Sequence, residues 1–251
     1  MTDVDAPWQW TPNVRADAHY ALYRALEEEQ EAAARMPAEA SETMRVLELA
    51  QIAFGRLRGL LAGVDDDLLD LDPAPGEWSL RRTLAHAIGV ERSYRANTEL
   101  ALARGDDDPL ILPQDPDGAV TTAKGTFRRP RPDPADTAGG VLDIIAAFAR
   151  RRAETDAALS GLTDEQLTLP AQWGQAKIDV RFRLHRFASH IVEHTVQCET
   201  TIATLGVPAN DPRLIVRAIG ALRGAHERRS SRQTLDALDA SLATKAEALG
   251  L

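Results

Sequence analysis

Apolar residues recur every three or four positions through seven segments of the chain, and stretches rich in proline or glycine separate these segments. This spacing places apolar side chains on one face of a helix, so we predict helices over 13–35, 41–63, 80–104, 141–159, 181–205, 212–228 and 231–249. Ser41 and Ser79 stand where N-caps are expected, and Gly206 and Pro208 end the fifth helix. The predicted fold class is all-α: a four-helix bundle with additional N- and C-terminal helices.

Residues 105–140 interrupt this pattern. They contain six prolines, and a basic group of Arg128, Arg129 and Arg131 follows Phe127. This composition predicts a long loop with a short strand pair, which is either a solvated surface loop or a lid over a site. We expect 163–180 to be a second connecting stretch. The predicted organisation is an N-terminal helical extension (1–40), the bundle with its loop or lid insertion (41–206), and a C-terminal helical extension (207–251).

The net charge is −9, and only three of the 29 basic residues are lysines. Nucleic-acid binding needs a clustered positive surface, so we expect no nucleic-acid partner. No apolar run is long enough to span a membrane, and residues 1–10 lack the features of a signal peptide. The lone Cys198 excludes an internal disulfide and suits a reducing compartment. We therefore expect a cytoplasmic protein with no membrane partner.

Two histidines stand four residues apart in the fifth predicted helix. His190 and His194 lie on one helix face about a turn from each other, so both imidazoles can reach a single divalent ion. Phe187 and Ile191 flank the pair, which indicates that this face points toward the core. The alternative is a pair of hydrogen-bonded histidines at the rim of the bundle, and spacing alone favours neither interpretation.

His86, in the third predicted helix, supplies a third imidazole. Its neighbours Ala85, Ala87 and Ile88 are apolar, which suits a position inside the bundle. Three histidines from facing helices would leave coordination positions open for water or substrate, as catalytic metal sites do. Taken alone, His86 is also compatible with a hydrogen-bonded core histidine.

Other side chains near these histidines allow both a functional and a packing interpretation. Cys198 lies one turn beyond the histidine pair and is better explained as core packing than as a ligand. Glu91 and Glu193 could orient an imidazole or face solvent. Tyr94 could contact a substrate, although packing is favoured, and Trp78 is interpreted as a packing residue. The remaining histidines have no suggestive partner spacing and receive no role: His19, His185 and His226.

The segment P-G-E-W-S-L-R-R-T-L-A-H-A-I-G-V-E-R-S-Y at 75–94, followed about a hundred residues later by H-x-x-x-H at His190 and His194, resembles the DinB/YfiT-like superfamily. The resemblance covers roughly 41–206. It implies an unusual four-helix bundle and a divalent metal, zinc or nickel and sometimes iron, at His86, His190 and His194. It is also compatible with a homodimer, because members of the superfamily often form dimers. Some thiol-dependent relatives use a carboxylate in place of one histidine, whereas this chain has three histidines.

Characterised members of the superfamily include S-transferases and isomerases that use mycothiol or bacillithiol. The metal domain of ergothioneine-forming sulfoxide synthases is similar, but this chain has no counterpart of their second, C-type-lectin-like domain. The resemblance therefore implies a metal-dependent transferase that adds a low-molecular-weight thiol to a small electrophile, with a small-molecule substrate as partner. Two alternatives are a non-enzymatic, stress-associated metal or small-molecule binding protein and an iron-dependent redox enzyme at the same three histidines.

Overall fold

The computed structural model describes residues 7–11, 14–18, 20–22, 24–25, 28–29, 40–105, 107–128, 130–173, 176–207 and 209–248. Two compact units share the chain. One comprises 40–50 and 64–206 and is called the bundle unit below. The other, the terminal unit, is drawn from the described parts of 1–39, 51–63 and 207–251. None of the helices in the described ranges is both long and apolar enough to cross a membrane.

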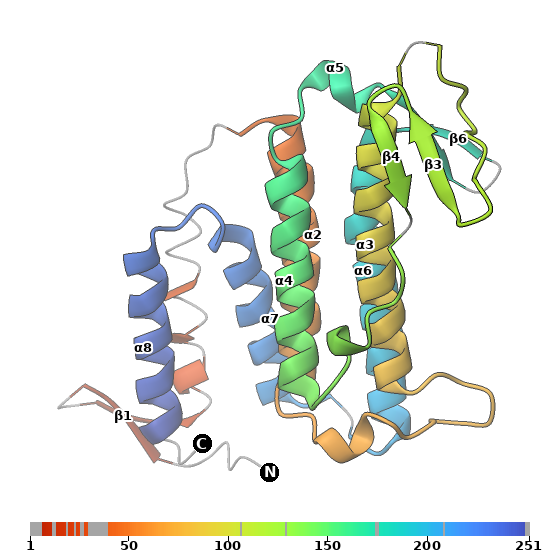
Figure 1. Ribbon diagram of the computed structural model, residues 1–251. Helices are drawn as coiled ribbons and strands as arrows, with labels where there is room; N and C mark the ends of the chain where they lie inside the picture. The colour runs from red at the N-terminus through yellow and green to blue at the C-terminus, as the bar shows by residue number, and fades with distance from the viewer. Residues whose placement is uncertain are drawn as a thin grey trace. The chain divides into compact units, whose positions relative to one another are not determined.

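Four long helices account for the architecture of the bundle unit: α2 (Glu42–Leu61), α3 (Leu80–Ala103), α4 (Val141–Leu159) and α6 (Val180–Thr204). The first nine residues of α2 belong to this unit and the rest to the terminal unit. Figure 1 shows α3 and α4 running in the same direction, with α2 and α6 reversed. The predicted all-α, four-helix fold class is confirmed, with a few short strands added.

Three of these helices, α2, α3 and α6, begin at a residue whose side chain accepts from a backbone N–H group of the first turn. The Ser41 hydroxyl accepts from Met44 N at 3.2 Å, and the Ser79 hydroxyl accepts from Arg82 N at 3.4 Å. The predicted caps at these two serines are therefore confirmed. At the start of α6, Asp179 Oδ1 accepts from Phe182 N at 2.7 Å. A carboxylate there also interacts favourably with the positive end of the helix dipole.

One cluster of buried apolar side chains in the bundle unit draws on all four helices. It is listed here in chain order: Val46, Leu47, Ala50, Tyr94, Ala101, Leu159, Leu162, Leu167, Ala171, Val180, Leu184 and Phe187. The members from α3 and α6 recur at helical spacing, so one face of each helix points into the cluster. Side chains on these two faces can therefore contact each other.

The segment between α3 and α4 contains the predicted strand pair. Strands β3 (Ala119–Thr122) and β4 (Gly125–Arg128) form an antiparallel hairpin, and the one-turn 3-10 helix η2 (Pro134–Asp136) follows it. Another one-turn 3-10 helix, η1 (Asp66–Leu68), lies between α2 and α3. The second connecting stretch also holds elements that the sequence did not indicate. These are the short helix α5 (Asp164–Leu167) and the antiparallel strands β5 (Pro170–Trp173) and β6 (Ala176–Asp179).

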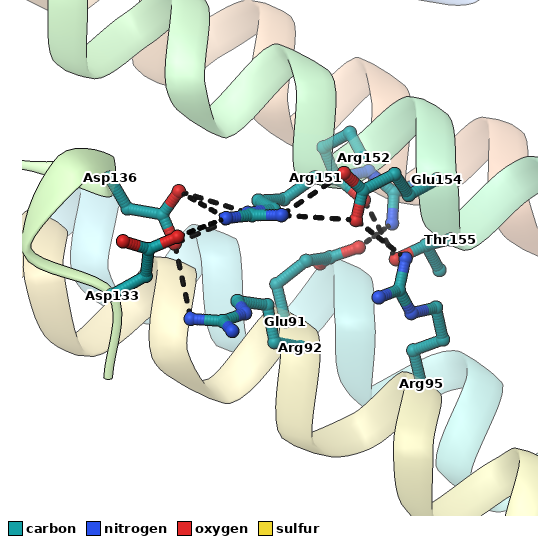
Figure 2. A network of polar contacts seen from close by, with 9 residues as sticks. All are labelled: Glu91, Arg92, Arg95, Asp133, Asp136, Arg151, Arg152, Glu154 and Thr155. Carbon is teal, nitrogen blue, oxygen red and sulfur yellow. Dashed lines mark hydrogen bonds and ion pairs between the residues drawn. The ribbon is translucent and has the colours of Figure 1, made fainter. Parts of the chain in front are cut away.

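Ion pairs join η2 to α3 and α4 (Figure 2). Arg151 contacts Asp133 and Asp136, each at 2.8 Å, and Arg92 contacts Asp136 at 3.3 Å. Deeper in the bundle unit, Arg152 Nη1 donates to Glu91 at 2.5 Å. Both members of that last pair are buried. Together these ion pairs hold η2 and α4 to α3, in addition to the apolar contacts.

In the terminal unit, the prediction of a single helix over 13–35 is wrong at its start. Strands β1 (Pro7–Thr11) and β2 (Val14–Asp17) pair in antiparallel fashion, and helix begins only at Ala18. The reason is local, because Asp17 Oδ1 accepts from Tyr20 N at 2.9 Å and caps the helix there. The last residues of the predicted helix, 30–35, lie outside the described residues.

Helices α7 (Asp211–His226) and α8 (Arg232–Ala248) complete the terminal unit. The second half of α2 approaches α7 so closely that glycine is required on both. A Cβ atom at Gly55 would stand 2.1 Å from Gly220 O, and one at Gly224 would stand 2.4 Å from Gln51 O. The two helices therefore contact each other through their backbones.

Candidate metal centre

Helices α3 and α6 bring the three predicted histidines together in the bundle unit. His86 comes from the second turn of α3, and His190 and His194 come from successive turns of α6. The ring centroids of His190 and His194 are 4.3 Å apart, and His86 lies 4.8 Å from His194 and 5.3 Å from His190. One nitrogen of each ring lies within 4.8 Å of the other two. The two helices run antiparallel, which is why residues a hundred positions apart meet here.

The ring nitrogens of the α6 pair have a spacing that suits shared ligation. His190 Nε2 and His194 Nε2 are 3.0 Å apart. Two imidazole nitrogens bound to one tetrahedral zinc ion at about 2.0–2.1 Å would be separated by roughly 3.3 Å. His194 Nδ1 lies 2.9 Å from Gln197 Oε1. An amide oxygen only accepts, so Nδ1 carries the proton and the Nε2 lone pair of His194 faces the cluster.

Burial differs across the three histidines. His190 and His194 are buried, whereas His86 is exposed and opens the group toward solvent. Burial, together with repulsion from the neighbouring His194, His86 and Arg186, lowers the pKa of His190 to about 3. Burial also lowers the pKa of His86, with His194 adding to the effect. At neutral pH both imidazoles are therefore uncharged, and their lone pairs are available to a metal ion.

Aromatic rings surround the histidines on two sides. The Trp78 ring meets His86 edge-on at 5.2 Å, and the Arg82 guanidinium lies 4.9 Å above the indole. Trp78 is half-buried, and besides packing before the start of α3 it contacts the candidate ligand His86. On the inner side, Tyr94 lies 5.7 Å from His190 and is buried, in agreement with its packing interpretation.

Neither glutamate near the histidines contacts an imidazole. Glu91 is buried and pairs with Arg152, whereas Glu193 is exposed and lies 3.7 Å from Arg186. Cys198 is fully buried, and burial raises its pKa to about 12. The packing interpretation of Cys198 is therefore supported. In the described ranges, the grouped candidate ligands are all imidazoles, so the set carries no negative charge.

Gln197 is the site residue that sequence reasoning missed. Its position three residues after His194 places it on a neighbouring part of the same helix face, and this spacing is the only signal that could have found it. Of the histidines without a predicted role, His185 is exposed and His19 lies outside the described residues. His226 is buried in the terminal unit, where it contacts Glu29 and lies 2.8 Å from Ser230 Oγ.

The β3–β4 hairpin, which carries Arg128, lies away from the three histidines. Arg128 lies beside the C-terminal half of α3, with Asn97 and Arg104, whereas His86 is near the N-terminal end of that helix. Asn97 is eleven residues from His86, which corresponds to about 16 Å along the helix axis. In this arrangement the hairpin therefore does not cover the histidines.

The fold and the histidine group together define a helical-bundle protein with a candidate metal centre. The family model of the DinB superfamily matches residues 49–198, more than half of the chain, and the protein belongs to that superfamily. The resemblance indicated by the sequence motifs is confirmed.

Among solved structures, the chain is similar to YfiT from Bacillus subtilis, described as a probable metal-dependent hydrolase with an unusual four-helix bundle topology. The two share 16% sequence identity with a TM-score of 0.43, over 68% of this chain and 92% of that one. No curated protein matches the chain.

Proposed function

We propose that His86, His190 and His194 hold one divalent metal ion, and that the protein is a metal-dependent enzyme acting on a small-molecule substrate. The observation that supports this most strongly is the grouping of three imidazole nitrogens within 4.8 Å, two of them buried and one exposed. Three protein ligands with an exposed side are typical of a catalytic metal site, whereas structural sites surround the ion with four. Zinc and nickel are the ions we expect first.

The donor set favours an anionic fourth ligand, because three neutral nitrogens leave the charge of a divalent ion uncompensated. When bound, such an ion lowers the pKa of a coordinated thiol, which is about 8.5 in free cysteine, and so supplies a nucleophile at neutral pH. We infer that a low-molecular-weight thiol of the mycothiol or bacillithiol type is transferred to a small electrophile. In that reaction the sulfur bonds to carbon, the leaving group departs with its electron pair, and the thiol proton passes to solvent.

The chain itself contributes positioning in this proposal. Exposed His86 leaves the centre accessible, and the Trp78 ring provides an apolar wall next to it. The Arg82 guanidinium stacked on that ring can pair with a carboxylate of the cofactor or substrate. Cys198 is not the nucleophile, because a fully buried thiol with a pKa of about 12 is protonated and inaccessible.

Metal analysis tests the first half of the proposal. The purified protein, expressed with ample metal, should contain about one zinc or nickel ion per chain, and His190→Ala should lose it. His185→Ala is the matched control, because His185 lies on the same helix but is exposed and outside the group. A wild type without metal, or a His190→Ala variant with unchanged content, would contradict the site. Iron as the bound metal would favour the redox alternative.

A thiol-addition assay tests the second half. Metal-loaded protein is mixed with mycothiol, bacillithiol or glutathione and a chlorobimane, and adduct formation is followed by fluorescence. We expect a rate above the uncatalysed reaction that falls by at least about a hundredfold in His86→Ala and His194→Ala but not in His185→Ala. Stoichiometric metal without acceleration of any thiol would leave the non-enzymatic binding protein as the better explanation.

A further inference from the structure

A cavity lies in the bundle unit, beside the C-terminal half of α3. Its volume is about 150 Å³. Helix α3 contributes Asn97 and Arg104, the β3–β4 hairpin contributes Phe127 and Arg128, and strand β5 contributes Gln172. The first α3 residue in the lining, Ala96, is ten residues and so almost three helical turns beyond His86, which separates the cavity from the histidines.

The polar lining of this cavity carries positive charge and no negative charge. Two of the fourteen lining residues are arginines, three are amides, and none is Asp or Glu. The nearby acid Asp108 is not part of the lining. Its Oδ2 already accepts from the backbone N–H groups of Gly105 and Ala123, at 2.8 and 2.9 Å. An electropositive cavity is notable in a chain with a net charge of −9.

Both guanidinium groups retain donors for a ligand. Arg104 Nη2 donates to Pro170 O at 2.8 Å, but its Nε is buried without an acceptor in the described part of the chain. The Arg128 side chain is exposed, and no hydrogen bond or ion pair joins its guanidinium to any residue that the structure describes. A buried donor without an acceptor is costly, and a bound anion would remove that cost.

The rest of the wall is apolar, and the volume suits one ring. The lining includes Leu100, Leu110, Val120 and Phe127. An engineered apolar cavity of about 150 Å³ in another protein binds benzene. We propose that this cavity binds a small organic anion consisting of one ring or a similar apolar body with a carboxylate or phosphate held by Arg104 and Arg128. This site goes beyond the proposed function and does not depend on it.

Isothermal titration of the full-length protein with benzoate, phenyl phosphate and the neutral analogue benzamide tests the proposal. We expect saturable, one-site binding of at least one anion, with benzamide bound at least about tenfold more weakly. Tighter binding of phenyl phosphate would assign a phosphate ligand, and tighter binding of benzoate a carboxylate ligand. If neither anion binds at millimolar concentration, or if benzamide binds equally well, the proposal is wrong.

Three variants locate the binding. Arg128→Gln and the cavity-filling Ala96→Phe should each weaken anion binding by about tenfold or more, whereas Arg150→Gln should not. Arg150 is an exposed residue of α4 outside the lining, so its substitution makes the same change in net charge. His194→Ala should bind the anion as wild type does, even where it has lost metal. Equal effects of Arg128→Gln and Arg150→Gln would overturn the assignment.

Discussion

The side chain of Gln197 determines which nitrogen of His194 is free to bind a metal ion. Its amide oxygen accepts from Nδ1, so the lone pair of the neutral ring remains on Nε2, 3.0 Å from His190 Nε2. Without an acceptor at Nδ1, the proton can move to Nε2 and block the face that the cluster needs. Gln197 is thus a positioning residue for the proposed centre.

We expect Gln197→Leu to lower metal affinity by about tenfold to a hundredfold, because an outer hydrogen-bond partner of a ligand imidazole has effects of this size. Gln197→Glu keeps an acceptor at the same position and should stay within a few-fold of wild type. Competition with a chromogenic chelator measures both affinities. An unchanged affinity in Gln197→Leu would show that the contact does not position His194.

Cys198 should be unreactive in the folded protein. Its pKa of about 12, against an ordinary value of 9.0, leaves about a thousandfold less thiolate at pH 8 than a free thiol has. Alkylation by iodoacetamide at that pH should therefore be very slow in native protein and fast in guanidinium chloride. Because the pKa is raised, reactivity should increase only as the pH approaches 12. Rapid modification of native protein at pH 8 would show that the thiol is exposed.

At the scale of elements, the contact between α3 and α4 depends on a buried charge pair. Arg152 donates to Glu91 and to Asp156, and its guanidinium also lies 5.7 Å from the Phe187 ring of α6. Removing one partner of a buried pair leaves the other charge without compensation, which costs more than the pair contributes. The pair of Arg95 with Glu154 in Figure 2 involves partly exposed groups and is worth less.

Arg152→Ala should lower the free energy of unfolding by about 3–5 kcal/mol, because Glu91 would stay buried without its cation. The control Arg95→Ala removes a contact to Glu154, which is 40% exposed, and should cost no more than about 1 kcal/mol. The variant Arg152→Met with Glu91→Leu should recover much of the loss. Urea denaturation followed by circular dichroism measures all three, and equal losses in the two single variants would contradict this account.

Helical periodicity predicted the bundle helices and two of their caps, because buried faces of α2, α3, α4 and α6 repeat over many turns. It did not predict β1–β2 or β5–β6, since strands of four or five residues repeat their pattern only twice. The three histidines were predictable from the i,i+4 spacing and from the motif around His86. The contacts of Glu91 were not, because Arg152 lies 61 residues further along the chain. The same holds for the cavity, whose walls come from three separate segments.

At the scale of the whole molecule, charge argues against a nucleic-acid partner. The chain carries 38 acidic and 29 basic residues, and many arginines of the described ranges are paired with acids, among them Arg81, Arg151 and Arg223. The guanidinium groups of Arg104 and Arg128 lie at one small cavity. A duplex backbone requires a broad positive surface, which these features do not provide. The homodimer admitted by the family resemblance stays a prediction that sedimentation equilibrium can check against a 27.3 kDa monomer.

We therefore expect no specific binding of duplex DNA at physiological ionic strength. Fluorescence anisotropy with a labelled oligonucleotide should show dissociation constants no tighter than about 10⁻⁴–10⁻⁶ M, the range of non-specific contacts. Metal-loaded and metal-free protein should behave alike. Submicromolar binding that weakens steeply with added salt would show that this expectation is wrong.

The parallel course of α3 and α4 also has a consequence for how fast the chain folds. A bundle of helical hairpins closes mainly through contacts between sequence neighbours. Here the segment 104–140 must run back along the bundle before α4 can pack parallel to α3. Contacts such as Thr43 to Leu162 join residues 119 positions apart. Ordering such long loops costs entropy before the contacts repay it, so the relative contact order of the bundle is raised. Its refolding rate should consequently fall below that of up-and-down four-helix bundles of equal stability.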